Sequence, residues 1–198
     1  MSFESVSIVG AGPVSGAIAI AVARTGTPVT LVRAAHADLG RVQERIDRRL
    51  GWEVDAGVLS PAEREVVRAR IDVASELSAL ASSDLVLEST AGDARSRRAL
   101  LATIEGSLSP GSVLAANAPA HHISALAEVL RRRDQFVGMR FFQPATQSSL
   151  VELSLLSDTA PGVAAACRAF CSRLSKDLVE QAESPPRIGY REYLHGSA

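Results

Sequence analysis

The sequence predicts a single α/β domain with a doubly wound, mostly parallel β-sheet. Short apolar segments alternate with helical patterns along the whole chain, as they do in sheets covered by helices on both faces. A glycine-containing turn follows the first apolar segment directly. The content of 46% hydrophobic and 22% charged residues is typical of a globular protein of 198 residues. We expect this domain to span residues 1–183, followed by a C-terminal tail at residues 184–198.

The first half of the chain alternates strand and helix, starting at its N-terminus. Val6–Val9 and Pro28–Val32 are apolar and β-branched, which predicts two strands, and the small residues of Ser15–Arg24 predict a helix between them. A helix with apolar residues at helical spacing follows around residues 39–50, and Ile71–Ala74 is the next expected strand.

A second helix is predicted before that third strand because its first residues carry start signals. Ser60 is suited to the N-cap, Pro61 to the first turn, and Glu63 completes a capping box.

The second half continues the alternation. Asp93 is predicted to cap a helix that runs to about Ile104, and a further helix is expected near Ser124–Leu130. A helix containing Cys167 and Cys171 precedes the last strand. The expected strands are Leu85–Glu88, Val113–Ala116, Phe136–Phe142, Val151–Leu156 and a segment near Leu178–Gln181.

Composition argues against several classes of partner. The net charge is −1 and the basic run at residues 131–133 is short and isolated, so we expect no nucleic-acid partner. The chain contains no run of about 18 apolar residues and begins with a strand, which predicts a cytoplasmic protein without a membrane partner. Cys167 and Cys171 lie four residues apart in an apolar stripe, which predicts helix core residues, and we expect no metal site.

The turn after the first strand is the strongest local signal of function. Gly10, Ala11 and Gly12 lie between a strand and a helix, where glycines let a dinucleotide pyrophosphate approach the backbone, and we expect Pro13 and Val14 to belong to the same cofactor site. This context predicts a Rossmann-like cofactor site. Two departures weaken it: Ser15 replaces the third glycine, and Pro13 removes a backbone donor.

Arg33 stands at the end of the second strand, where an acid usually binds the ribose 2′-hydroxyl. A guanidinium at this position suits a 2′-phosphate, so we expect NADP to be favoured over NAD. The alternative is an exposed arginine without a role in binding.

Several motifs resemble the 3-hydroxyacyl-CoA dehydrogenase family, specifically its N-terminal NAD(P)-binding domain. The resemblance implies a Rossmann-like domain that, in the family, precedes a helical domain which completes the acyl-binding cleft and forms the dimer. We expect the helical domain to be absent here. The motifs are GAGPVSGAIA from residue 10, DLVLES at 84–89, LSPGSVLAANAP at 108–119, VGMRFFQPA at 137–145, LVEL at 150–153 and, more weakly, SPPRIGYR at 184–191.

Most catalytic positions of the family are replaced in this chain. The resemblance places Arg140 at the family's catalytic histidine, Gln143 at an asparagine of the same motif, Pro119 at a serine and Tyr190 at a further asparagine. An arginine remains protonated near neutral pH, so Arg140 cannot act as the base of an alcohol oxidation.

Other positions are retained or keep their charge. Glu152 matches the acid that orients the histidine, and Asn117 matches an asparagine beside the nicotinamide pocket. Arg97 keeps the charge of a lysine that contacts the cofactor, whereas Gly92 replaces a nearby glutamate.

Three interpretations of these side chains remain open. Arg140 and Glu152 are consistent with a buried structural salt bridge. They are also consistent with an oxyanion or carboxylate binder and a base, which suits enolisation, dehydration or cyclisation. His122, beside His121 in a predicted loop, is either a relocated proton carrier or a solvated loop residue.

Two functional hypotheses follow. The first is a divergent oxidoreductase that uses NADP, or NAD, on a 3-oxoacyl or 3-hydroxyacyl thioester or a polyketide-like substrate. The second is a protein without redox activity and without a cofactor: an isomerase, dehydratase or cyclase, or a catalytically silent binding protein. Because the surface covered by the helical domain would be exposed, we also expect a homodimer with Tyr193 and Leu194 near the contact.

Overall fold

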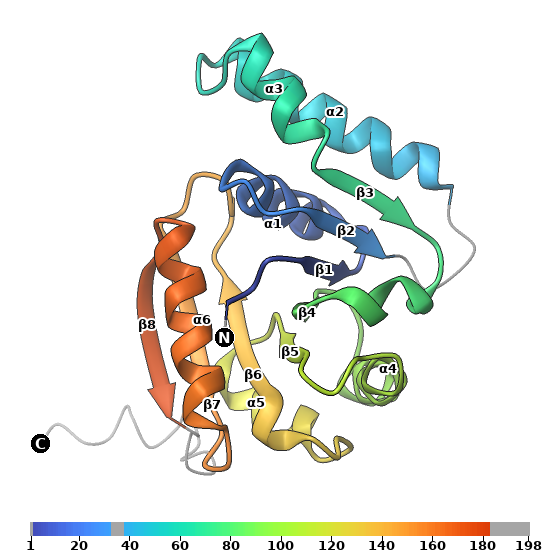
Figure 1. Ribbon diagram of the computed structural model, residues 1–198, viewed down its shortest axis with the longest axis vertical. Coiled ribbons are helices and arrows are strands. Elements are labelled where there is room, and N and C mark those ends of the chain that lie inside the picture. The colour runs from blue at the N-terminus through green and yellow to red at the C-terminus, as the bar shows by residue number, and fades with distance from the viewer. Residues whose placement is uncertain (1, 33–37, 183–198) are drawn as a thin grey trace, which may run out of the picture.

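The computed structural model describes residues 2–32 and 38–182, which form one eight-stranded sheet (Figure 1). The strand order is β3-β2-β1-β4-β5-β6-β7-β8. Strands β1 to β6 are parallel, β7 is antiparallel to β6, and β8 is parallel to β7. The predicted doubly wound, mostly parallel sheet is confirmed. The strands are β1 Val6–Val9, β2 Val29–Val32, β3 Ile71–Ala74, β4 Leu85–Glu88, β5 Val113–Ala116, β6 Phe136–Phe141, β7 Leu150–Leu155 and β8 Asp177–Ala182.

Helices cover both faces of the sheet because alternate strand residues point to opposite sides. On one face, Ile8 and Leu87 belong to a core packed under α1, α2, α3 and α6. On the other, Val9 and Val86 belong to a core packed under α4 and α5. The helices are α1 Pro13–Arg24, α2 Leu39–Asp55, α3 Pro61–Arg68, α4 Ala94–Gly106, α5 Ala120–Ala127 and α6 Pro161–Arg173.

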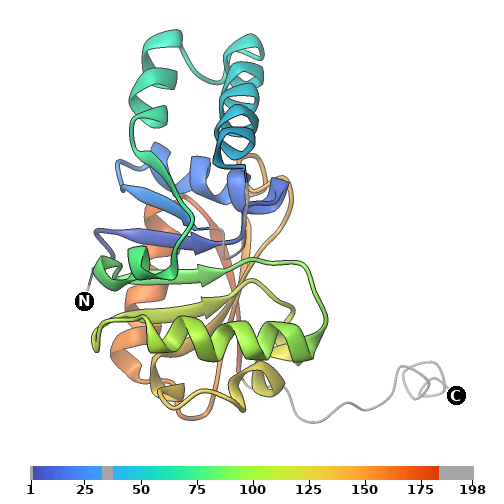
Figure 2. The same ribbon diagram turned by 90° about the vertical axis from the view of Figure 1, so that its right-hand side faces the viewer.

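Helices α2 and α3 extend beyond the sheet at one end of the molecule (Figure 2). The predicted capping box at the start of α3 is confirmed: the Glu63 backbone N–H donates to Ser60 Oγ at 3.2 Å, and the Ser60 N–H donates to the Glu63 carboxylate at 2.8 Å. The carboxylate also accepts from the Ser60 hydroxyl at 2.7 Å, and the backbone and side-chain bonds from Ser60 together lower the pKa of Glu63.

The bounds of four predicted strands, β1, β3, β4 and β5, agree with the structure residue for residue. Among the starts of the helices, the largest difference lies at α5, which begins at Ala120 rather than near Ser124. Proline has no backbone N–H and clashes with a preceding helical turn, so it is tolerated at the start of a helix but not in its interior. Pro119 is the N-cap residue of α5. His121 and His122 therefore lie in the first turn of a helix and not in a loop.

Cys167 and Cys171 lie in α6 and are buried, as the apolar stripe predicted. Burial raises the pKa of each thiol to about 12, so both are protonated at neutral pH. None of the helices within residues 2–32 and 38–182 combines the length and the apolar character needed to span a membrane.

Candidate functional site

The candidate site lies at the carboxyl ends of β1 and β4, where the strand order reverses. Val9 pairs with Val32 on one side and with Glu88 on the other, so the chain leaves β1 and β4 in opposite directions across the sheet. Ligands of open α/β sheets bind in the crevice at such a switch point. A pocket of about 430 Å³ lies here, lined by Gly10–Gly12 from one side and Ser89–Ala91 from the other.

The glycine turn has the geometry that a dinucleotide pyrophosphate needs. Gly10 adopts φ +133°, and a Cβ at this residue would lie 2.5 Å from the Ser89 carbonyl oxygen. Gly12 is the N-cap of α1 and carries no side-chain cap, so the helix presents backbone N–H groups and its positive dipole end to the crevice. A Cβ at Gly12 would meet nothing within 4 Å, so the space in front of the helix is open. These residues fit a dinucleotide.

Ser15 stands in the position of the third glycine and packs between α1 and the end of β4. Its side chain is fully buried, and its hydroxyl donates to the Ser89 carbonyl oxygen at 3.1 Å. The side chain of Ser15 therefore connects α1 to the end of β4 through a hydrogen bond.

A buried ion pair lies at the end of β4. Glu88 is fully buried, accepts a hydrogen bond from the Thr90 backbone N–H at 2.8 Å, and pairs with the Arg97 guanidinium, whose Nε donates at 3.0 Å. Arg97 also donates to the Asn117 carbonyl oxygen at 3.3 Å. The charge of Arg97 is thus balanced by Glu88, which the sequence analysis did not identify as a partner.

Asn117 connects the ends of three strands. Its side-chain amide donates to Ser89 Oγ at 3.0 Å, and its amide oxygen accepts from the Phe141 backbone N–H at 3.2 Å. Both ends of the side chain are therefore occupied, and the residue connects the carboxyl ends of β4, β5 and β6.

Arg140 and Glu152 lie directly opposite each other on the antiparallel strands β6 and β7. Their nearest charged atoms are 3.9 Å apart, so the pair is a loose ion contact. The Arg140 side chain is 39% exposed and lies over the Phe142 ring at 4.7 Å from its centroid, while Glu152 is 11% exposed. The pair therefore differs from the buried salt bridge that one interpretation expected.

His122 is exposed on the first turn of α5, and its ring lies 4.1 Å from the His121 ring, centroid to centroid. The same helix end approaches Glu152, whose carboxylate accepts a hydrogen bond from the Ala120 backbone N–H. The structure thus brings Arg140, Glu152 and the N-terminus of α5 together. Arg33, Tyr190, Tyr193 and Leu194 lie outside the described residues.

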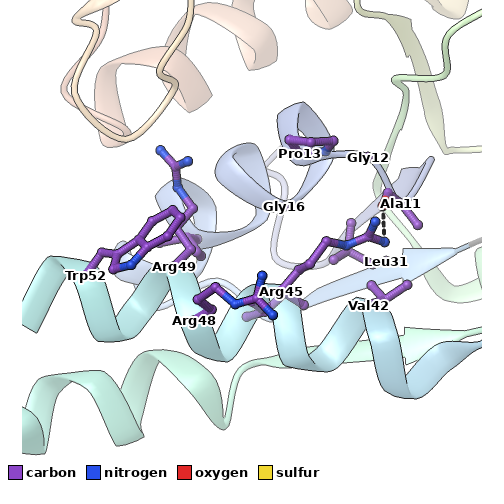
Figure 3. Close-up of a pocket in the computed structure, with 12 residues that line it drawn as sticks. Ala11, Gly12, Pro13, Gly16, Leu31, Val42, Arg45, Arg48, Arg49 and Trp52 are labelled. Carbon is purple, nitrogen blue, oxygen red and sulfur yellow. Dashed lines mark hydrogen bonds between the residues drawn. The ribbon is translucent and has the colours of Figure 1, made fainter.

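A second pocket, of about 190 Å³, lies between α1 and α2 next to the glycine turn (Figure 3). Its apolar floor includes Leu31 and Val42, and its rim carries side chains from one face of α2. The spacing i, i+3, i+4 and i+7 marks this face in the sequence, although no site was predicted there. The rim residues are Arg45, Arg48, Arg49 and Trp52.

The sheet order and the glycine turn define a Rossmann-like domain of the dinucleotide-binding class. The chain belongs to the family of the 3-hydroxyacyl-CoA dehydrogenase NAD binding domain, whose model matches residues 5–184. It is 31% identical over 181 residues to the fatty acid oxidation complex subunit alpha of Psychrobacter arcticus, covering 90% of this chain and 25% of that protein. The chain thus spans about a quarter of the length of this curated relative.

Solved structures agree with this assignment. FadB2 of M. tuberculosis superposes with a TM-score of 0.88 at 27% identity, covering 95% of this chain and 67% of that one. The (S)-3-hydroxybutyryl-CoA dehydrogenase PaaH1 of Ralstonia eutropha superposes with a TM-score of 0.87 at 29% identity, covering 96% of this chain and 67% of that one. The resemblance predicted from the motifs is confirmed.

Proposed function

We propose that the protein is an oxidoreductase that binds a nicotinamide dinucleotide at the glycine turn and acts on a 3-oxoacyl or 3-hydroxyacyl thioester. The observation that carries this proposal is the N-terminus of α1, which follows Gly10 and Gly12 and faces the open crevice at the switch point. The names of the structural relatives, which include a 3-hydroxybutyryl-CoA dehydrogenase, support the substrate class. A polyketide-like substrate with the same 3-oxo group remains part of the proposal.

In this proposal the side chains at the carboxyl ends of the strands have separate roles in binding, positioning and proton transfer. Gly10–Gly12 and the N-terminus of α1 would hold a nicotinamide dinucleotide, which would supply or accept the hydride when bound. Arg140 donates hydrogen bonds to the oxygen of the substrate carbonyl and stabilises negative charge that develops there. Glu152 accepts the Ala120 N–H bond and lies opposite Arg140 with 3.9 Å between their nearest charged atoms, which suits Glu152 to positioning Arg140. His122, in the first turn of α5, is our candidate for the proton carrier.

Arg140 cannot exchange a proton near neutral pH, so we expect very low turnover of acetoacetyl-CoA with either reduced cofactor. Arg140→His should raise this rate, because the resemblance places the family's catalytic histidine at this position. A rate in the unmodified protein of about 10 s⁻¹, common for enzymes, would contradict this assignment of the site.

We propose NADP as the preferred cofactor because of Arg33. NADPH should bind more tightly than NADH, and Arg33→Asp should reverse or abolish the difference, since a carboxylate repels the 2′-phosphate and accepts from a 2′-hydroxyl. Equilibrium titrations of both cofactors with both proteins test this. Equal affinities in the unmodified protein would contradict the preference, and a lack of binding by both cofactors would contradict the redox function itself.

A second candidate function is supported by the exposed Arg140 guanidinium, which needs no cofactor to bind an oxyanion or a carboxylate. In this alternative Glu152 acts as a base in an isomerase, dehydratase or cyclase, or the protein only binds its ligand. The rate of deuterium exchange at C2 of acetoacetyl-CoA, measured without cofactor and compared with the rate in buffer alone, tests it: an acceleration by the protein that is lost in Glu152→Gln would favour this class. Exchange no faster than in buffer, together with tight NADPH binding, would favour the oxidoreductase.

We further propose that the protein is a cytoplasmic homodimer. Within the described residues, β8 has a neighbouring strand on one side only, and its Val179 is exposed. An open strand edge and an exposed apolar surface are common features of interfaces. Light scattering at tens of micromolar should give the mass of two chains, whereas a stable, folded monomer would contradict the dimer.

A further inference from the structure

Arg45 reaches from α2 to the glycine turn. Its side chain projects from the second turn of α2, and Nη2 donates to the Ala11 carbonyl oxygen at 2.7 Å (Figure 3). Arg45 contributes to both pockets described above, the one between α1 and α2 and the one at the ends of β1 and β4. Arg48, Arg49 and Trp52, which share its helix face, line only the first of these two pockets. Arg45 is therefore the side chain of this face that borders the cofactor crevice.

The charge of Arg45 is not balanced by the residues around it. Within residues 2–32 and 38–182, no carboxylate lies within ion-pair distance of its guanidinium, whereas Arg41 on the same helix pairs with Asp38 at 3.4 Å. A guanidinium has five N–H donors, and Arg45 uses one nitrogen on a neutral carbonyl group. The guanidinium lies beside the positive dipole end of α1, so one full and one partial positive charge adjoin the same crevice. An anion in the crevice would relieve this repulsion and use the remaining donors.

The composition of the turn explains why a side-chain donor is useful here. Pro13, the first residue of α1, has no backbone N–H and so removes one of the donors that a phosphate would use. Arg45 lies at the same turn and offers charged donors, which bind phosphate oxygens more strongly than neutral ones do.

We propose that Arg45 binds a phosphate group of the dinucleotide cofactor and compensates for the donor that Pro13 removes. This inference rests on the proposed dinucleotide binding. The phosphate is either the pyrophosphate, which is present in both cofactors, or the 2′-phosphate of NADP. In both cases the guanidinium donates hydrogen bonds to negatively charged phosphate oxygens.

Calorimetric titration of the full chain with NADPH and with NADH tests the inference. Arg45→Ala should raise the Kd of at least one cofactor tenfold or more, because alanine removes the charged hydrogen-bond donors that bind phosphate oxygens. Arg45→Lys should retain part of the affinity, since it keeps the charge but loses the planar fork. The matched control is Arg48→Ala, one turn further along the same helix and outside the crevice, which should change neither Kd more than twofold.

The two cofactors identify the phosphate. An equal loss for NADH and NADPH places Arg45 on the pyrophosphate, and a loss confined to NADPH places it on the 2′-phosphate; both outcomes support the inference. The affinity of the unmodified protein should also fall with added salt more steeply than that of Arg45→Ala.

Two outcomes overturn the inference and differ in what else they affect. If the unmodified protein binds a cofactor and Arg45→Ala binds it equally well, Arg45 is not a phosphate ligand, while the proposed function stands. If the unmodified protein binds neither cofactor, both proposals fail. Thermal melting establishes that each variant is folded, and Arg45→Gln, which keeps a donor for the Ala11 carbonyl group but no charge, replaces the alanine variant if that one is unstable.

Discussion

The carboxylate of Glu152 accepts a hydrogen bond from the Ala120 backbone N–H at 2.8 Å, which connects β7 to the first turn of α5. The N-cap residue of α5, Pro119, has no side-chain acceptor, so Glu152 supplies an anion to the positive end of the helix from a different part of the chain. One residue therefore positions both the helix that carries His122 and the opposite side chain, Arg140. The site around Arg140 depends on this contact.

The first prediction concerns the stability contributed by Glu152. Glu152→Ala should lower the free energy of unfolding by about 2 kcal/mol, because it leaves a helix-terminal donor without its charged acceptor. Glu152→Gln should cost about half as much, since an amide oxygen still accepts the bond. Urea denaturation measures both, with Glu180→Ala as the control. Glu180 lies on β8 in a largely exposed pair with Arg168, so its loss should cost under about 1 kcal/mol. Equal costs for Glu152→Ala and Glu180→Ala would contradict the capping role.

The second prediction compares two neighbouring arginines of α4. Arg97→Met should destabilise the protein by about 3–5 kcal/mol, because the fully buried Glu88 carboxylate loses its counter-charge. Arg98→Met removes an exposed pair with Glu128 at 2.9 Å and should cost less than about 1 kcal/mol. Chemical denaturation of the two variants gives the comparison directly. The double change Arg97→Met with Glu88→Gln should recover part of the loss, and a double variant no more stable than Arg97→Met would show that the buried charge is not the cause.

The third prediction separates the structural and binding roles of the two glycines. Gly10→Ala should destabilise the fold by at least about 1–3 kcal/mol, because its Cβ would lie 2.5 Å from the Ser89 carbonyl oxygen at a positive φ. Gly12→Ala should leave the melting temperature nearly unchanged, since nothing lies within 4 Å of its Cβ. If the proposed cofactor site is right, Gly12→Ala should nevertheless weaken dinucleotide binding, because its methyl group projects into the crevice. Unchanged cofactor affinity in a folded Gly12→Ala variant would argue against a pyrophosphate at this turn.

The sequence predicted the sheet well because its strands are short, apolar and bounded by glycine, proline or capping residues. Val6–Val9 and Val113–Ala116 carry these signals at both ends, and both match the structure. The start of α5 was placed four residues late because its N-cap acceptor comes from Glu152, which is distant in sequence. Local pattern reasoning cannot detect a cap supplied by another strand.

The candidate site was only partly predictable for the same reason. The glycine turn is a local motif, so its residues and its role as the start of α1 could be identified from the sequence. The pairing of Arg97 with Glu88 and the reach of Arg45 to Ala11 depend on how β4, α2 and α4 pack in three dimensions. An arginine row along α2 was visible in the sequence, but its proximity to the glycine turn was not.

The last prediction uses the two buried cysteines as internal probes of stability. Burial raises the pKa of Cys167 and of Cys171 to about 12, whereas a thiol in the unfolded chain titrates near 8.5. Between these pH values the unfolded chain binds fewer protons than the folded one, so the free energy of unfolding should fall as the pH rises above about 9.

Urea denaturation at pH 8 and at pH 10, for the unmodified protein and for the double variant Cys167→Ala with Cys171→Ala, measures this contribution. The alanine variant should be less stable at both pH values because of the lost packing, yet its stability should fall less between them, since it has no thiols to ionise. Other titrating groups are common to both proteins, so they cancel in the difference. In the folded protein both thiols should also resist alkylation at pH 8, because the reactive thiolate is scarce and the side chains are inaccessible. Rapid labelling of the native protein, or the same pH dependence in both proteins, would mean that the α6 face is open to solvent.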